Sequence, residues 1–314
     1  MVSRVAFLFP GQGSQQPGMG REIHRAFPES REVFERADEA LGFHLSRMCF
    51  EGAADELART EITQPAILTV SVAAQRALES RGVRPLAAAG HSLGEYSAHV
   101  AAGTISFEDA VRAVRLRGRF MQEAVPLGAG SMAAILGLDA EQVRSICEEC
   151  AEGEVVSAAN VNGGGQIVIA GHAAAVARAS ARALQAGARR AVPLAVSAPF
   201  HCALMEPARE RLRPVLEEME FRDPRVPVFA NADAAPVTTA AAARDALVRQ
   251  VVSPVRWEET VRRMAEGGMR LFLEVGPGRV LAGLVRRIAR EAEVLPACGS
   301  EEILSAVGRV EEAA

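Results

Sequence analysis

The segment from Gly90 to Gly94 reads GHSLG and lies between a short apolar run and a helical pattern that ends at Gly103. This is the context of a nucleophile elbow, a sharp turn that raises a serine hydroxyl above a sheet at a helix N-terminus. Ser92 is therefore the candidate nucleophile, and a chance match to G-x-S-x-G is the alternative. The backbone N–H of Leu93 would point to the same place and could bind a developing oxyanion.

A serine nucleophile needs a base, and the chain offers six histidines: His24, His44, His91, His99, His172 and His201. His201 is the best candidate because it follows a predicted strand and precedes a long helical pattern, whose positive end favours a neutral imidazole. A purely structural histidine is the alternative. His91 adjoins Ser92 but is held by the elbow.

No acidic residue stands out as the third member of a triad. Asp223 and Asp233 lie in turn-like contexts after His201, but no motif surrounds them. A backbone or amide oxygen can also hold an imidazole in the required tautomer.

The first predicted strand runs into the segment FPGQGSQ, residues 9–15. A dinucleotide fingerprint would require glycine where Gln16 stands, so the segment is not one. A tight turn at the carboxyl end of a strand is nevertheless a usual place for a site in an open α/β sheet. The backbone of Gln12 could supply a second oxyanion donor, and a plain turn is the alternative.

Arg117 lies in the centre of the apolar face of a predicted helix, with Val114 and Met121, whereas the other arginines of that helix cluster on the opposite face. A buried guanidinium requires an anionic partner, because an unpaired buried charge costs several kcal/mol. That partner is either a ligand or an internal salt bridge, unless the side chain extends to solvent.

The cysteines give no sign of a metal or redox site. Cys147 and Cys150 form a C-x-x-C in the middle of a helical pattern, without a second cysteine pair or nearby histidines, so we interpret them as structural. Cys202 adjoins His201, but neighbouring side chains diverge in direction. Five scattered cysteines in a chain of 314 residues are expected to be free thiols in a reducing cytosol.

Composition narrows the class of protein. The formal net charge of -4 excludes a generally basic protein that coats nucleic acid, although all 35 basic residues are arginine. The apolar run at residues 5–9 is too short for a signal peptide, and no stretch reaches the roughly 20 apolar residues of a membrane-spanning helix. A cytoplasmic protein is expected.

Three strand-turn-helix junctions position these residues. The apolar runs at residues 4–9, 85–90 and 271–276 each end in a glycine-containing turn that precedes a helical pattern. Such alternation predicts an α/β fold with a parallel sheet covered by helices.

The middle of the chain has a different pattern. Residues 131–196 are predicted as strand, helix, strand, strand, helix and strand, with Asp139 as an N-cap and the turn Asn162 to Gly165 joining two strands as a hairpin. The order βαββαβ is that of a ferredoxin-like unit. We therefore predict a small domain at 130–196, inserted near Gly130 and Ser197 into a core made of 1–129 and 197–314.

Eight segments together carry a family resemblance. They are, in order, FPGQGSQ, TQPAIL, GHSLGEYSA, LRGRFMQEAVP, NVNGGGQIVIAG, SAPFHCALM, RQVVSPVRW and FLEVGPGRVLAGL. Over residues 5–284 the chain resembles the malonyl-CoA:acyl-carrier-protein transacylases of fatty-acid synthesis and the related acyltransferase domains of polyketide synthases. The resemblance implies an α/β-hydrolase-like core with a ferredoxin-like insert.

The resemblance also implies roles for individual residues. Ser92 matches the nucleophile, His201 the base, and Gln250 the residue whose main-chain oxygen orients that histidine. The backbones of Gln12 and Leu93 match the oxyanion hole. The positions implied in substrate binding are Arg117, which matches the arginine that pairs with the malonyl carboxylate, and Met121, Phe200, Asn160, Asn162, Gln64 and His91.

The implied reaction is ping-pong transfer of malonyl from malonyl-CoA, through an ester on Ser92, to the phosphopantetheine thiol of acyl carrier protein. It needs no cofactor or metal and involves neither nucleic acid nor membrane, and the enzyme is expected to be a monomer. The acidic carrier protein would dock on a local basic patch, for which Arg189 with Arg190 and Arg286 with Arg287 are candidates.

Three other functions stay open on sequence alone. An acyltransferase that serves a polyketide synthase shares all of this chemistry. A serine esterase is expected to carry an acid after the nucleophile and no arginine directed at the acyl pocket. A carrier-binding module without catalysis would not need Ser92, His201 and Arg117 together.

Overall fold

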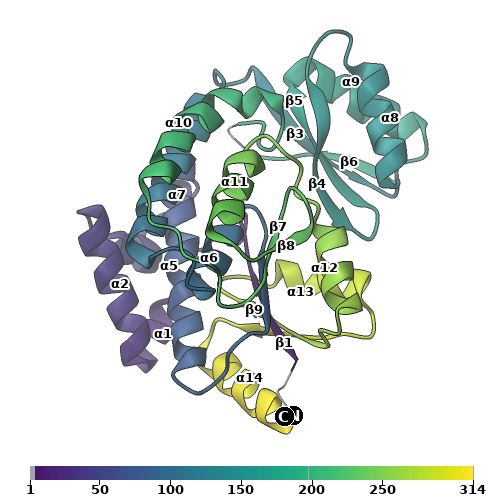
Figure 1. Ribbon diagram of the computed structural model, residues 1–314. Helices are drawn as coiled ribbons and strands as arrows, with labels where there is room; N and C mark the ends of the chain where they lie inside the picture. Colours follow the sequence, from purple (N-terminus) through teal and green to yellow (C-terminus); the bar gives the residue numbers. More distant parts are fainter. Residues whose placement is uncertain (1–3, 197, 314) are drawn as a thin grey trace.

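The computed structural model describes residues 4–196 and 198–313, and its main body is built on a six-stranded sheet (Figure 1). The strand order is β10-β9-β1-β2-β7-β8, and all neighbours are parallel except β7 and β8. The strands are β1 (Val5–Phe9), β2 (Ala87–Gly90), β7 (Val228–Ala230), β8 (Ala235–Val237), β9 (Leu271–Val275) and β10 (Glu293–Ala297). The predicted α/β class with a parallel sheet is therefore confirmed.

Helices cover both faces of this sheet because its central strands are apolar on both sides. Phe7 and Phe9 of β1 face one core, whereas Ala6 and Leu8 face a second core that contains Trp257. The helices of the main body are α1 (Arg21–Ala26), α2 (Pro28–Leu41), α3 (Leu45–Glu51), α4 (Ala54–Leu57), α5 (Thr60–Glu79), α6 (Gly94–Ala101), α7 (Phe107–Glu123), α10 (Glu206–Glu218), α11 (Ala240–Gln250), α12 (Trp257–Glu266), α13 (Val280–Ile288) and α14 (Ser300–Glu312).

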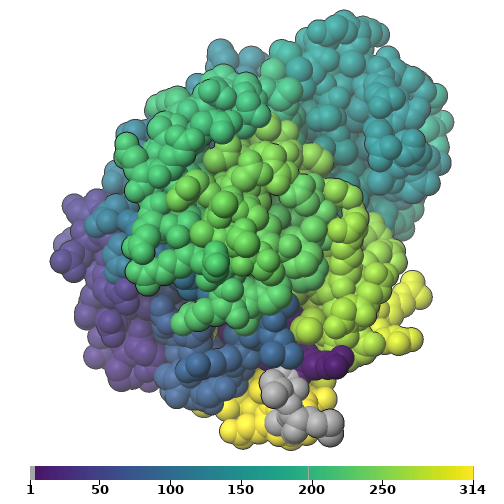
Figure 2. All heavy atoms as spheres, in the orientation of Figure 1, coloured from purple at the N-terminus to yellow at the C-terminus, as the bar shows by residue number. Residues whose placement is uncertain are grey.

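A second, antiparallel sheet forms the lobe at the upper right of Figure 2. Its order is β4-β5-β3-β6, the one that a ferredoxin-like βαββαβ unit requires. Its elements are β3 (Gly130–Leu136), α8 (Ala140–Cys150), β4 (Val156–Gly163), β5 (Gln166–His172), α9 (Ala173–Gln185) and β6 (Arg190–Pro193). The domain boundaries at 130 and 196 stay a prediction, and the predicted re-entry point at Ser197 lies outside the described residues.

Several local predictions in this lobe are confirmed. Asp139 caps α8 in a reciprocal capping box with Gln142. Gly164 and Gly165 both have positive φ, as a two-residue hairpin loop between β4 and β5 requires. Cys147 and Cys150 are buried, and all five cysteines are free.

The two sheets are joined by main-chain hydrogen bonds beside the carboxyl ends of β1 and β2. Val255, just before α12, donates to the oxygen of Ala159 at 2.8 Å and accepts from Val161 at 2.9 Å. This contact lays β4 next to the elbow that follows β2. Within the described parts of the chain, no helix is long and apolar enough to cross a membrane.

Candidate active site

The turn after β2 has the geometry of a nucleophile elbow. Ser92 has a φ of 50°, which a side-chain-bearing residue adopts rarely and only where its surroundings enforce it. A Cβ on Gly90 would lie 1.9 Å from the carbonyl carbon of Gly94, and a Cβ on Gly94 would lie 2.1 Å from the oxygen of Phe9. Both glycines are therefore required, as the sequence predicted.

Asn231, at the end of β7, holds this turn in place and was not predicted. Its Oδ1 accepts from the backbone N–H of Ser92 at 2.7 Å, and its Nδ2 donates to the oxygen of Gly90 at 2.7 Å. The available signal was its position, since a polar residue directly after a buried strand lies at the carboxyl edge of the sheet.

His201 contacts the serine on one side and a main-chain oxygen on the other. Its Nε2 lies 2.6 Å from Oγ of Ser92, and its Nδ1 lies 3.0 Å from the main-chain oxygen of Gln250. Only a protonated Nδ1 can contact a carbonyl oxygen as a donor, so Nε2 is free to accept the serine proton. Burial, assisted by the positive charge of Arg117, lowers the pKa of His201 to about 3. The imidazole is therefore neutral near pH 7.

The two predicted oxyanion donors have free N–H groups. Among the described residues, no protein acceptor contacts the backbone N–H of Gln12 or that of Leu93. The loop after β1 packs closely on the elbow: a Cβ on Gly11 would lie only 2.3 Å from the oxygen of His91. Both N–H groups thus belong to segments that border the Ser92 hydroxyl.

Arg117 is buried with only neutral partners. Its exposed fraction is 1%. Nη1 donates to Oε1 of Gln64 at 2.8 Å, and Nη2 donates to Oε1 of Gln250 at 2.9 Å and to Oγ of Ser92 at 3.1 Å. No carboxylate of the described chain forms an ion pair with it, and its Nε has no partner. The alternative of an internal salt bridge is therefore wrong.

His91 connects the elbow to the second sheet. Its Nε2 lies 2.8 Å from Oδ1 of Asn162 on β4, and its ring lies against Trp257 with the centroids 5.6 Å apart. Burial lowers the pKa of His91, so this imidazole is also neutral near pH 7.

A small cavity of about 120 Å³ opens on the Ser92 hydroxyl between the two sheets. Its lining includes ten of the predicted site residues: Gln12, Gln64, His91, Ser92, Leu93, Arg117, Met121, Asn160, Phe200 and His201. Gln250 and Asn162 lie behind this lining and contact it. Met132 and Val196 also line the cavity and were missed, because a strand pattern does not tell which face meets a neighbouring domain.

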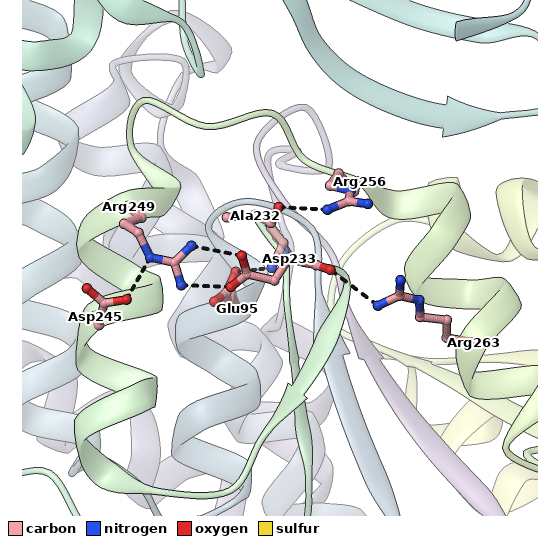
Figure 3. Close-up of polar contacts among 8 residues, drawn as sticks. Glu95, Ala232, Asp233, Asp245, Arg249, Arg256 and Arg263 are labelled. Atoms are coloured by element: carbon pink, nitrogen blue, oxygen red, sulfur yellow. Dashed lines mark hydrogen bonds and ion pairs between the residues drawn. The ribbon is translucent and has the colours of Figure 1, made fainter. Parts of the chain in front are cut away.

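Arginine side chains hold a turn of residues 231–234 that begins at Asn231, the residue that binds the elbow (Figure 3). Asp233 accepts two hydrogen bonds from the Arg249 guanidinium, at 2.8 and 2.7 Å. Arg256 and Arg263 donate to main-chain oxygens of the same turn. Arg249 directly precedes Gln250, so its two hydrogen bonds to Asp233 connect the end of α11 to the turn that begins at Asn231. Asp233 thus pairs with arginine rather than with His201.

Asp223 also lies outside the site, since it accepts from the N–H of Ala240 at the start of α11. Within residues 4–196 and 198–313, no three His, Cys, Asp or Glu side chains are grouped so that they could hold a metal ion.

Comparisons with known proteins agree with this geometry. The acyl transferase domain model matches residues 6–304. A malonyl CoA-acyl carrier protein transacylase from Escherichia coli strain K12 is 52% identical over 288 residues, which cover 91% of this chain and 93% of the relative. The solved transacylase from Coxiella burnetii superposes with a TM-score of 0.97 at 45% identity, covering 99% of this chain and 98% of that one.

A third match is a malonyl-transacylase solved in complex with a type II PKS acyl-carrier protein. It has a TM-score of 0.95 and 47% identity, and the match covers 98% of this chain and 100% of that chain. The shared fold thus extends over nearly the whole chain. From the family model, the sequence identity and the shared fold, this chain belongs to the acyl transferase domain family and, within it, to the malonyl CoA-acyl carrier protein transacylases.

Proposed function

We propose that this acyltransferase moves a malonyl group from malonyl-CoA to the phosphopantetheine thiol of acyl carrier protein, through an ester on Ser92. The observation that carries the proposal is the position of Arg117. A buried guanidinium without a carboxylate partner lies 3.1 Å from a serine hydroxyl that also contacts a neutral histidine. The names of the relatives agree with this activity.

The first half-reaction forms the ester. Oγ of Ser92 attacks the thioester carbonyl carbon of malonyl-CoA while Nε2 of His201 accepts the hydroxyl proton. The N–H groups of Gln12 and Leu93 stabilise the tetrahedral oxyanion. The carbon–sulfur bond then breaks, and coenzyme A leaves as a thiol with the proton from His201.

The second half-reaction reverses these steps with a different thiol. The phosphopantetheine thiol gives its proton to His201, and its sulfur attacks the ester carbonyl carbon. The bond to Oγ of Ser92 breaks, and the oxygen regains the proton. Both halves use one site, so the kinetics are ping-pong. The main-chain oxygen of Gln250 stabilises the imidazolium that forms in each half.

Arg117 supplies specificity for the free carboxylate of the malonyl group. A guanidinium can hold a carboxylate through two parallel charge-assisted hydrogen bonds. The neutral oxygens of Gln64 and Gln250 orient the guanidinium without competing for it by charge. The apolar side chains of Met121, Met132 and Phe200 border the rest of the small cavity.

The carrier protein would dock beside the hairpin turn between β4 and β5. The side chain of Arg287 lies against Gly164, and the side chain of Arg189 lies against Gly137, whose N–H donates to the oxygen of Gly165. One arginine of each predicted pair, Arg189 and Arg287, therefore flanks this turn, two residues beyond Asn162 at the cleft, whereas Arg286 donates to the main-chain oxygen of Val294. The four arginines are exposed, and within the described structure none forms an ion pair.

The proposal also covers the metabolic pathway that the enzyme serves. We assign the enzyme to fatty-acid synthesis, as the names of the relatives suggest, and service to a polyketide synthase is the alternative. A monomeric, cytoplasmic enzyme that uses no cofactor stays the expectation from the sequence.

The test is a reaction with malonyl-CoA in the absence of carrier protein. We expect a malonyl adduct that peptide mass spectrometry places on Ser92 and that addition of holo carrier protein removes. Ser92→Ala is the matched control and should form no adduct. Absence of an adduct, or an adduct that persists in Ser92→Ala, overturns the assignment of the nucleophile.

A further inference from the structure

Glu95 is a fully buried carboxylate beneath the active site that the proposed reaction does not use. It lies on α6, three residues after Ser92. Its Oε2 accepts from Nε2 of Gln250 at 2.7 Å and from the backbone N–H of Asn231 at 2.9 Å, whereas its Oε1 has no partner in the part of the chain that the structure describes. Among the described residues no arginine contacts Glu95 directly, which is unusual for a buried carboxylate.

The side chain of Gln250 lies between this carboxylate and Arg117. Its amide nitrogen donates to Glu95, and its amide oxygen accepts from Nη2 of Arg117 at 2.9 Å. The amide dipole thus has its positive end on the anion and its negative end on the cation. Hydrogen bonds in such a chain polarise one another and strengthen the attraction between the two ends.

The other ionisable groups around Glu95 carry little net charge. Asp233, in the turn after β7, is neutralised by Arg249 of α11. Tyr96 is the next residue on α6, and burial raises its pKa, so its hydroxyl stays neutral. His201 is neutral because burial lowers its pKa. Among the described residues, Glu95 and Arg117 are thus the two charges of this buried region that are not neutralised by a direct partner.

We propose that Glu95 is a positioning residue that acts as the counter-ion of Arg117 through the side-chain amide of Gln250. A carboxylate in direct contact would occupy the guanidinium that the substrate must reach. A guanidinium without any compensating anion would be costly to bury. A carboxylate one amide away compensates the charge of Arg117 and leaves the cavity side of the guanidinium open.

A consequence follows for malonyl transfer, and this part rests on the proposed function. Burial already raises the pKa of Glu95 to about 7. When a malonyl carboxylate joins Arg117, two carboxylates share one guanidinium, and the pKa of Glu95 rises further. Above pH 7, formation of the malonyl-enzyme is therefore coupled to the uptake of a proton by Glu95. Formation of the malonyl-enzyme becomes less favourable as the pH rises.

The first test is a double-mutant cycle on the melting temperature. Arg117→Ala should lower Tm more at pH 8 than at pH 6, because Glu95 is mostly ionised at pH 8 and has lost its counter-ion. Adding Glu95→Gln, which keeps an acceptor oxygen but removes the charge, should restore several degrees at pH 8. In the wild-type background, Glu95→Gln should either lower Tm or raise it by less than it does in the Arg117→Ala background.

Glu274→Gln is the matched control for the cycle. Glu274 is equally buried and accepts from the backbone N–H groups of Leu281 and Ala282, but no arginine within residues 4–196 and 198–313 binds it. We expect this substitution to change Tm by the same amount with and without Arg117. If Glu95→Gln also has the same effect in both backgrounds at both pH values, Glu95 is not the counter-ion.

The second test measures the rate of Ser92 malonylation by malonyl-CoA alone between pH 6 and pH 8.5. We expect a several-fold fall with rising pH in the wild type and a nearly flat profile in Glu95→Gln, whereas acetylation by acetyl-CoA should show no such difference. An equal fall in both proteins overturns the coupling. If the wild type forms no ester on Ser92 at any pH, the proposed function fails, and the Tm cycle still decides the role of Glu95.

Discussion

Nδ1 of His201 lies 3.0 Å from the main-chain oxygen of Gln250, so the proposed base is oriented by an atom that every residue type possesses. The side chain of Gln250 has separate partners, because it accepts from Arg117 and donates to Glu95 and to the main-chain oxygen of Ser92. This division explains why no acid for the histidine was found in the sequence. It also means that the two roles of Gln250 can be separated by substitution.

Gln250→Ala should therefore impair malonyl selection more than it impairs the nucleophile. The loss of a neutral acceptor for a charged donor corresponds to about 2 kcal/mol, or roughly a 30-fold fall in kcat/KM for malonyl-CoA. Labelling of Ser92 by a neutral fluorophosphonate should change much less, since the main-chain oxygen for His201 remains. Gln250→Met, which keeps the volume, is the control for packing. A labelling rate that falls as far as malonyl transfer contradicts this division.

The second prediction concerns stability in acid. His99 and His201 are buried, and burial lowers the pKa of each to about 3, whereas both titrate near 6.5 when unfolded. A lowered pKa means that the folded state binds fewer protons, so its stability is complete above pH 6.5 and is lost as the pH falls toward 3. Each histidine should cost roughly 3 kcal/mol between pH 7 and pH 4.

Urea denaturation at pH 7 and pH 4 measures this loss. His99→Gln is the informative variant, because the ring nitrogens of His99 have no partner among the residues that the structure describes and the residue lies outside the cavity. It should reduce the acid-induced loss by roughly 3 kcal/mol relative to the wild type. The pKa of Glu95 is raised, so its contribution has the opposite sign and falls as the pH rises from 4.5 through 7. An unchanged acid sensitivity in His99→Gln would contradict the assignment.

The sequence predicted the parts of the fold and site that depend on local pattern. The elbow at Ser92, the apolar placement of Arg117 and the hairpin at Gly164 and Gly165 each follow from the residue types that a sharp turn or a helical face requires. The order of the second sheet followed from its alternation of strands and helices. These features are set within a few residues, so a single sequence suffices to find them.

Contacts between segments that are distant in the sequence could not be predicted in this way. Asn231 approaches Ser92 only because β7 pairs with β2, and no local pattern states that pairing. Glu95 stood in a segment that was singled out, but its role depends on Gln250, which lies 155 positions away. Met132 and Val196 enter the cavity because the second sheet docks on Val255. Each missed residue thus depends on a tertiary contact and not on a wrongly predicted helix or strand.

The third prediction tests the proposed docking patch. Reversing Arg189 and Arg287 together to Glu should raise the KM for carrier protein several-fold and leave the KM for malonyl-CoA nearly unchanged, because an acidic partner would lose attraction and the cavity is untouched. Arg84→Glu is the control, since Arg84 is exposed and precedes β2 at the opposite edge of the sheet. Equal effects on both substrates, or none on either, would remove the patch from the docking surface.

The last prediction is that Arg117 selects for a carboxylated acyl group. Its partners Gln64, Ser92 and Gln250 are all neutral, so no direct anionic partner is lost when it is removed. With acetyl-CoA in the cavity the guanidinium has no carboxylate to bind, which disfavours acetyl transfer by a few kcal/mol, or roughly a hundredfold in rate. Arg117→Ala should therefore reduce kcat/KM for malonyl-CoA strongly and spare or improve it for acetyl-CoA.

Near pH 6, where Glu95 is mostly protonated, the melting temperature of Arg117→Ala should change little, so the kinetic change is not a consequence of unfolding. The measurement is kcat/KM for both substrates in wild type and variant, with a melting curve for each at pH 6. If both substrates lose activity equally, or if the variant is unfolded at that pH, Arg117 is a structural residue and the source of malonyl selectivity lies elsewhere in the cavity.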